Sequence, residues 1–135
     1  MGILFATDEW IKALMVELNQ SEGYAKAASK WEGDFYFVVN KGGAIEEDVF
    51  LYMDLWHGEC RDAFKTDDAG TKSPEFKLKA PLDVWQGVID KKIDPIQGIV
   101  TRKLKLEGPM MKVMKAPKAA IELVEACGRL DTDWP

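Results

Sequence analysis

The chain has 135 residues, 47% of them hydrophobic and 30% charged, which is typical of a globular domain that builds its own core. Its formal net charge of −5 argues against a nucleic-acid-binding protein, because phosphate contacts require a basic face. Cys60 and Cys127 are far apart, and with the single histidine His57 they cannot supply a zinc site. We therefore expect one domain, residues 1–135, with no metal and no cofactor.

The first half of the chain predicts two helices followed by three antiparallel strands. Thr7 is a suitable N-cap for a helix over residues 7–19, where apolar residues recur at helical spacing. Ser21 caps a second expected helix that runs to about Lys30. After a turn at Glu32–Gly33–Asp34, strands are expected at 35–40, 49–56 and 59–64, with tight turns at Lys41–Gly42–Gly43 and His57–Gly58. The middle strand is apolar on both faces, which indicates that the sheet is covered on both sides.

The second half predicts a strand, two short helices, a strand and a final helix. Asp94 is placed to cap a helix that begins at Pro95, where a missing N–H has no cost. Gly128 is expected just beyond the end of the final helix. The expected elements are a strand at Phe76–Ala80, a helix at Leu82–Asp90, a short helix from Pro95, a strand at Leu104–Glu107 and a helix from Pro117.

These elements predict an α+β fold with a five-stranded mixed, mostly antiparallel sheet covered by about five helices. The fourth and fifth strands are joined through helices, a connection that permits a parallel crossover. The short helices over residues 82–100 each present branched or aromatic side chains to one side. Such helices over a sheet leave gaps that form either an apolar pocket or a filled core, and periodicity alone does not separate the two.

No catalytic motif stands out in the sequence. A small hydrolase or isomerase would have to use His57 as a base with Cys60 or Asp62, and a surface position in a turn is the simpler interpretation of this histidine. No run approaches the ~18 apolar residues that span a bilayer. The start of the chain lacks the basic region of a secretory signal, so we expect a cytoplasmic protein with reduced thiols.

The basic residues are concentrated between positions 102 and 118. This segment holds six basic residues against the single acid Glu107, a balance of +5, so the rest of the chain carries −10. Methionines and a valine lie among the lysines. Such a mixture is either a solvated lysine face or a contact for an anionic membrane surface, and no nucleic-acid contact is expected.

The stretch EFKLKAPLDVWQGVIDKKIDPIQGIVTRKLKLEG resembles the second half of the sterol-carrier-protein-2 domain, also called the nonspecific lipid-transfer protein. The resemblance rests on a helix with a central aromatic, here Trp85, on the Asp94–Pro95 helix start, and on the Lys-Leu-Lys-Leu-Glu-Gly phrase at Lys103–Gly108. Residues 76–111 match by motif, and nearly the whole chain matches by the order of its elements.

The resemblance implies an apolar tunnel between sheet and helices that binds fatty acyl chains, acyl-CoA, phospholipids or sterols without catalysis. The wall residues that it implies are Trp85, Val88, Ile89, Ile96, Ile99, Val100, Met110, Met111 and Met114. The peroxisomal tripeptide of the family is missing, so that location does not carry over. The acidic tail Asp131–Thr132–Asp133 is expected to close the tunnel mouth or to serve a homodimer. The alternative function is a dimerisation module of the same fold with a filled core.

Overall fold

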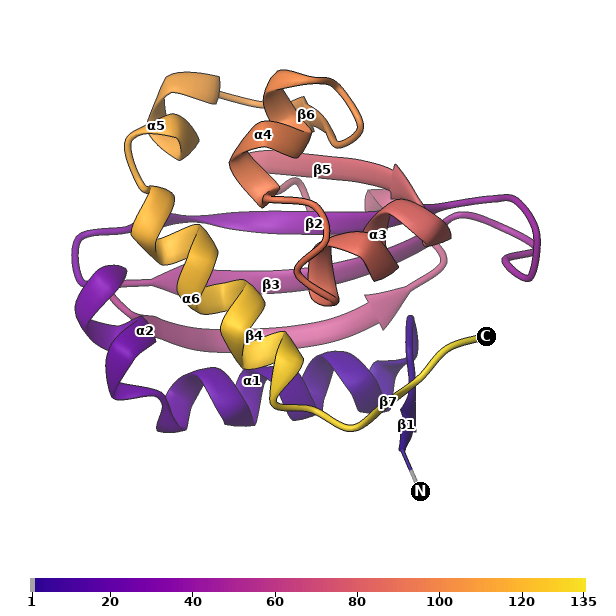
Figure 1. Cartoon of the computed structure of the whole chain (residues 1–135), viewed down its shortest axis with the longest axis horizontal. Helices are drawn as coiled ribbons and strands as arrows, with labels where there is room; N and C mark the ends of the chain where they lie inside the picture. The colour runs from indigo at the N-terminus through magenta and orange to yellow at the C-terminus, as the bar shows by residue number, and fades with distance from the viewer. Residues whose placement is uncertain (1) are drawn as a thin grey trace.

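A five-stranded sheet with the order β4-β3-β2-β5-β6 is the centre of the computed structural model, which describes residues 2–135 (Figure 1). β2, β3 and β4 form an antiparallel meander, β5 runs parallel to β2, and β6 runs antiparallel to β5. This arrangement confirms the predicted mixed, mostly antiparallel sheet. The strands are β2 (Glu32–Asn40), β3 (Val49–Trp56), β4 (Glu59–Thr66), β5 (Phe76–Pro81) and β6 (Lys105–Glu107).

Residues 2–135 also form six α-helices, and α3, α4 and α6 lie over the same face of the sheet in Figure 1. α1 packs along β4 and β3, and α6 packs against α1, α2, α3 and α4. None of the helices in this part of the chain has the length and apolar character needed to cross a membrane. The helices are α1 (Asp8–Gln20), α2 (Glu22–Ala27), α3 (Leu82–Ile89), α4 (Pro95–Val100), α5 (Met110–Met114) and α6 (Pro117–Gly128).

Side-chain caps fix where three of these helices begin. The Thr7 and Ser21 hydroxyls accept hydrogen bonds from the backbone N–H groups of the first turns of α1 and α2. The Asp94 carboxylate accepts from the backbone nitrogens of Ile96 and Gln97, with Pro95 at the first helical position of α4. Each cap satisfies donors that the helix itself leaves unpaired, as the sequence predicted.

The second face of the sheet is covered by the connection between β4 and β5. This loop crosses the sheet and includes a short 3₁₀ turn, η1 (Ala69–Thr71). The Tyr36 hydroxyl accepts a hydrogen bond from the backbone nitrogen of Lys72 and lies 3.2 Å from the Ala69 carbonyl oxygen. Tyr36, Val38 and Tyr52 are buried beneath the loop. The prediction that residues 49–56 are covered on both faces is confirmed for the middle of the strand, at Tyr52, but not at Trp56, which is exposed.

The start of β2 differs from the sequence prediction. The turn expected at Glu32–Gly33–Asp34 is wrong, because these residues pair with Trp56, Leu55 and Asp54 at the far end of β3. Gly33 allows the strand to continue here, since a Cβ atom at this position would lie 2.8 Å from the ring of Phe76.

Three further boundaries or connections also differ. α2 ends at Ala27 rather than near Lys30, because residues 28–30 turn the chain toward β2. Gly128 is the last residue of α6, and Arg129 caps the helix in its place. The helical connection between the fourth and fifth expected strands permitted a parallel crossover, but these two strands, β5 and β6, pair antiparallel. The chain returns from α4 at the end where β5 finishes, so that Lys105 pairs with Lys79 and β6 runs antiparallel.

The two ends of the chain pair with each other beside the start of α1. β1 (Ile3–Leu4) and β7 (Thr132–Asp133) form a two-stranded parallel ribbon, a feature that the sequence did not predict. The ring of Trp134 packs on Phe5 at a centroid distance of 4.7 Å, and the Trp10 indole N–H donates to the Thr132 hydroxyl at 3.0 Å. The acidic tail is therefore fixed over the N-terminal residues.

Candidate functional site

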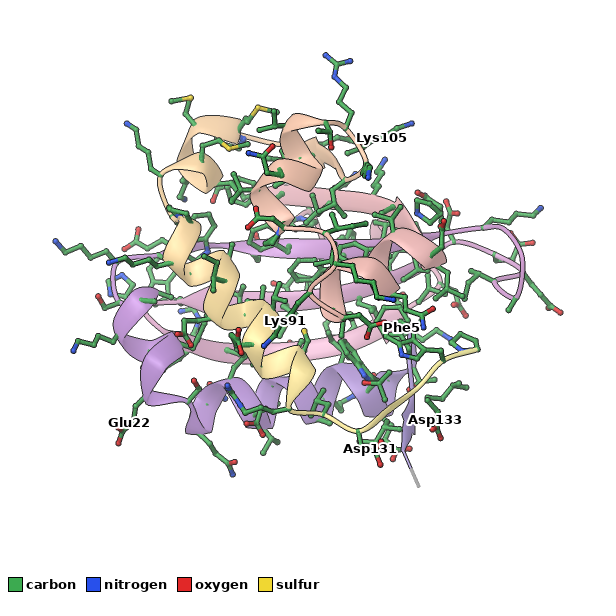
Figure 2. All side chains as sticks on the ribbon, in the orientation of Figure 1. Phe5, Glu22, Lys91, Lys105, Asp131 and Asp133 are labelled. Carbon is green, nitrogen blue, oxygen red and sulfur yellow. The ribbon has the colours of Figure 1, made fainter. Side chains whose placement is uncertain are left out.

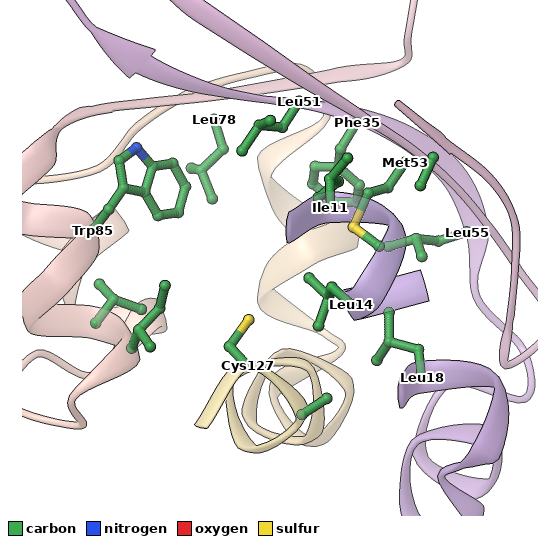
Figure 3. Close-up of a cluster of buried hydrophobic side chains, with 14 of the residues drawn as sticks. Ile11, Leu14, Leu18, Phe35, Leu51, Met53, Leu55, Leu78, Trp85 and Cys127 are labelled. Carbon is green, nitrogen blue, oxygen red and sulfur yellow. The ribbon is translucent and has the colours of Figure 1, made fainter. Parts of the chain in front are cut away.

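An apolar cavity of about 120 Å³ lies between the sheet and the helices. Its floor is the inner face of β2, β3 and β5, and its walls come from all six helices. Figure 3 shows Trp85 of α3 and Cys127 of α6 pointing into the space between the helices and the strand residues Leu78 and Leu51. Apart from one tyrosine hydroxyl, one thiol and the tryptophan indole nitrogens, the lining side chains are apolar, so the site suits a ligand without charge along most of its length.

Aromatic rings form one continuous wall of the cavity. Trp31 stacks on Phe35 at 5.8 Å, and Phe35 stacks on Phe37 at 5.0 Å along β2. Phe37 then meets Trp85 edge to face at 6.0 Å. Phe76 supports this row from β5, stacked on Phe35 at 4.8 Å. Rings locked in such contacts give a rigid surface that keeps its shape when no ligand is bound.

The indole N–H groups around the cavity are already used by the protein. Trp85 donates to the Val38 carbonyl oxygen at 2.9 Å, in a fully buried bond. Trp31 donates to the Gly33 carbonyl oxygen at 3.1 Å. Together with the Trp10 bond to Thr132, these contacts turn the polar edge of each indole away from the cavity. The rings therefore present only their apolar parts to an occupant.

The two ionisable groups of the wall stay neutral. Burial raises the pKa of the Cys127 thiol to about 12, and burial also raises the pKa of the Tyr24 phenol above its usual value. A neutral thiol is a weak nucleophile, because the thiolate is the reactive form. The site thus lacks a charged group that would repel an apolar chain or activate a bond.

An empty cavity of this size is costly to the fold. Large-to-small substitutions in protein cores cost about 24 cal/mol per Å³ of cavity, so about 120 Å³ corresponds to roughly 3 kcal/mol. Apolar cavities of similar size stay dry and accept apolar guests. An apolar ligand that fills the space restores the missing contacts, and the cavity is therefore the candidate binding site of this protein.

The structure brings four of the nine wall residues named from the sequence to the cavity. These four are Trp85, Val88, Ile89 and Ile99. Ile96 and Met114 are half-buried and lie outside the lining. Val100, Met110 and Met111 are exposed at the surface of α4 and α5. Ligand contact by any of the nine residues stays a prediction.

Much of the wall comes from segments that the sequence did not single out. Trp10, Ile11 and Leu14 line the cavity from α1, and Leu123 and Cys127 line it from α6. These residues follow the helical spacing that also marks an ordinary core. The number of aromatic residues in the N-terminal half was the one available signal, and it does not say which rings meet a cavity.

The histidine considered as a catalytic base lies elsewhere. His57 is half exposed in the β3–β4 turn, with its Nε2 atom 2.6 Å from the Glu32 carboxylate and its ring stacked on Trp56. The Cys60 thiol donates to the Asp62 carbonyl oxygen, and burial raises its pKa to about 12. Within residues 2–135, no hydrogen bond joins His57 to Cys60 or to Asp62, so the geometry gives the hydrolase alternative no support.

Comparison with known proteins agrees with the fold and the cavity. The model of the SCP-2 sterol transfer family matches residues 11–120. A crystal structure of sterol carrier protein 2 is 31% identical, with a TM-score of 0.84 over 93% of this chain and 98% of that chain. The solution structure of a conserved hypothetical protein from Thermus thermophilus, described as possibly a sterol carrier protein, is 30% identical, with a TM-score of 0.87 over 98% of this chain and 95% of that chain.

A more distant likeness shows that the fold also occurs inside enzymes. A sec-alkylsulfatase from Pseudomonas is 16% identical, with a TM-score of 0.51 over 93% of this chain but only 16% of the enzyme. This likeness concerns the fold alone. No curated protein matches the chain. Because the family model covers most of the sequence and two structures at 30% identity or more match it nearly end to end, the chain belongs to the SCP-2 sterol transfer family.

Proposed function

We propose that the protein binds a fatty acyl chain in the cavity and carries it between lipid surfaces without chemical change. The observation that supports this proposal is the apolar cavity between the sheet and the helices, lined by rings whose polar edges face away from it. Family membership agrees with lipid binding in general. Neutral thiols and the position of His57 favour binding over catalysis.

The size of the cavity favours a flexible chain over a sterol. A space of about 120 Å³ is comparable to cavities that accept a single benzene-sized guest. A rigid ring system would require the whole wall to move, including the stacked rings of β2. An acyl chain is also larger than this space, but it is narrow and flexible, so it enters with a smaller movement of the wall than a sterol requires. We therefore place fatty acids, and the acyl chains of acyl-CoA or phospholipids, ahead of sterols.

The alternative of a dimerisation module is less favoured. That alternative predicts a filled core, and the cavity beside Trp85 argues against one. Homodimerisation itself, like residence in the cytoplasm, stays a prediction from the sequence.

Titration of palmitate into the purified protein tests the proposal. Three of the five tryptophans line the cavity, so their fluorescence should change and saturate at one palmitate per protein. At roughly 100-fold excess over Kd the ligand should add about 2.7 kcal/mol to the free energy of unfolding. For a domain of this size that corresponds to an increase in Tm of about 10 °C.

A fluorescent sterol in the same assay is the comparison. We expect the sterol to bind more weakly than palmitate. A protein whose fluorescence and Tm do not respond to micromolar palmitate would contradict the proposal, and tighter binding of the sterol would contradict the choice of an acyl chain.

A further inference from the structure

Large apolar side chains are exposed at one end of the molecule, where α4 and α5 lie. Val100 is 60% exposed, Met110 47% and Met111 66%. These are three of the seven large hydrophobic side chains exposed among residues 2–135. Figure 1 places α4, α5 and β6 near β5, at the opposite edge of the sheet from α1. The exposed apolar side chains therefore lie on two short helices at the same end of the molecule.

The same end of the molecule carries unpaired positive charge. Glu107, the single acid of the segment 102–118, pairs with Lys79, and this pairing lowers the pKa of its carboxyl. Within the described part of the chain, five of the six basic side chains of the segment form no ion pair; they are Arg102, Lys103, Lys105, Lys115 and Lys118. Figure 2 shows Lys105 projecting at this edge, far from Asp131 and Asp133 at the other end. The protein is thus polarised, with a local excess of cations on a chain of net charge −5.

We propose that the exposed surface of α4 and α5, together with these five cations, is a docking surface for anionic lipid membranes. Exposed methionine and valine side chains can enter the boundary between headgroups and acyl chains, and the lysines around them can contact anionic headgroups. Charge complementarity selects this occupant. A second copy in a symmetric contact would bring the same five cations against this surface, whereas an anionic membrane matches both the apolar side chains and the positive charge.

The docking surface lies over one end of the cavity. Ile99, beside the exposed Val100, lines the cavity, and so does Val113, one turn from the exposed Met110. Unlike the other described helices, α5 makes no extensive contact with any single helix or strand. Gly108, with a φ of 127°, and Pro109 precede it, and Pro117 starts the next helix. Helices with few packing contacts open at low cost.

One side chain ties α5 to the sheet. The Lys112 ammonium lies 3.1 Å from the Glu75 carboxylate and 5.3 Å from the centre of the Trp31 ring, and it also donates to the Glu32 carbonyl oxygen. Trp31 is the first ring of the aromatic wall. Anionic headgroups would compete with the Glu75 carboxylate for the Lys112 ammonium, so docking would weaken the attachment of α5. The movement of α5 would then give an acyl chain access to Trp31. This role as an entrance rests on the proposed carrier function; the docking itself does not.

The variant M110S/M111S tests the docking surface. Both side chains are exposed, so the fold should be kept, and the Tm of the variant verifies this. The V16S variant, which removes an exposed valine from α1, is the matched control. Binding is measured by co-sedimentation with phosphatidylcholine vesicles that contain or lack phosphatidylserine. We expect wild type and V16S to bind the anionic vesicles preferentially and M110S/M111S to bind them roughly tenfold more weakly.

A second pair of variants tests the charge. K103Q/K115Q removes two cations from the docking surface, and K26Q/K41Q makes the same change in net charge on α2 and beyond β2. Each cation near an anionic surface is worth about fivefold in partitioning, so K103Q/K115Q should bind roughly 25-fold more weakly than K26Q/K41Q. Added salt should reduce the difference.

Equal binding of wild type to neutral and anionic vesicles would overturn the docking surface. An equal loss of vesicle binding in M110S/M111S and V16S, or in K103Q/K115Q and K26Q/K41Q, would also overturn it. If wild type is a dimer that does not bind vesicles, and M110S/M111S is a monomer, the surface is a contact for a second copy and the docking proposal is overturned.

Palmitate titration without vesicles separates the docking proposal from the proposed carrier function. K103Q/K115Q should bind palmitate within about twofold of wild type, because neither lysine lines the cavity. A wild type that binds vesicles but not palmitate would contradict the carrier function alone.

Discussion

Trp85 does two things for the cavity, and both follow from where its indole lies. Its ring closes the aromatic wall against Phe37, and its N–H group satisfies the buried Val38 carbonyl oxygen from the helix side. α3 is thereby fixed to the sheet at a defined distance, which keeps the space beneath it open. A residue of the same volume without a donor would fill the position but would not tie α3 to the strand.

The W85F substitution should lower the free energy of unfolding by about 1–3 kcal/mol, because the buried Val38 carbonyl loses the indole donor and the smaller ring leaves space behind it. Urea denaturation of the two proteins measures the change. W56F is the matched control, since Trp56 is 38% exposed, and it should change stability by less than about 0.5 kcal/mol. Equal losses in the free energy of unfolding of W85F and W56F would contradict the stabilising role of this hydrogen bond.

At the scale of single elements, the sequence was informative where local chemistry decides the structure. The caps Thr7, Ser21 and Asp94 predict helix starts because a short polar side chain can pair the free N–H groups of the first turn. β1 and β7 could not be predicted in this way. Each has two residues, and they pair across almost the whole chain, so no period or turn marks them. The direction of β6 likewise depends on the path of the chain through α3 and α4.

The residues of the cavity wall were likewise predictable from the sequence only in part. Trp85, Val88, Ile89 and Ile99 were predicted through the family resemblance, and they line the cavity. The α1 and α6 residues could not be separated from core by sequence, because a helix shows the same apolar stripe whether it faces a filled or an open space. Met110 and Met111 are exposed because of the position of α5 relative to the rest of the fold, and the local sequence pattern does not determine that position.

The ribbon of β1 and β7 should stabilise the end of the cavity that Phe5 and Trp10 line. The W134A substitution removes the ring that covers Phe5, so we expect the free energy of unfolding to fall by roughly 2 kcal/mol. Thermal or urea unfolding measures this loss. Deletion of Pro135 alone is the control and should have little effect. A W134A protein as stable as wild type would mean that the tail rests on the fold without supporting it.

For the whole molecule, buried neutral thiols link stability to alkaline pH. Burial raises the pKa of both Cys60 and Cys127 to about 12, from about 9 for an exposed thiol. Above about pH 9 the unfolded chain releases protons that the folded state keeps, so the free energy of unfolding falls as the pH rises toward 12. Below pH 9 this contribution is fully present.

Urea midpoints of wild type and C60A/C127A at pH 7, 9 and 10.5 test this linkage. Wild type should lose stability more steeply than the variant above about pH 9, whatever their difference at pH 7. Parallel curves for the two proteins would assign the alkaline loss to other groups, such as the buried tyrosines.

The central claim is that the cavity between sheet and helices holds an acyl chain. Native mass spectrometry after addition of palmitate to wild type, C127L and C127A tests it most directly. Cys127 points into the cavity, so leucine should fill the space and alanine should leave it open (Figure 3). We predict one bound palmitate in wild type and C127A, and at least roughly tenfold less in C127L. Equal binding by all three proteins, or binding by none, would contradict the claim.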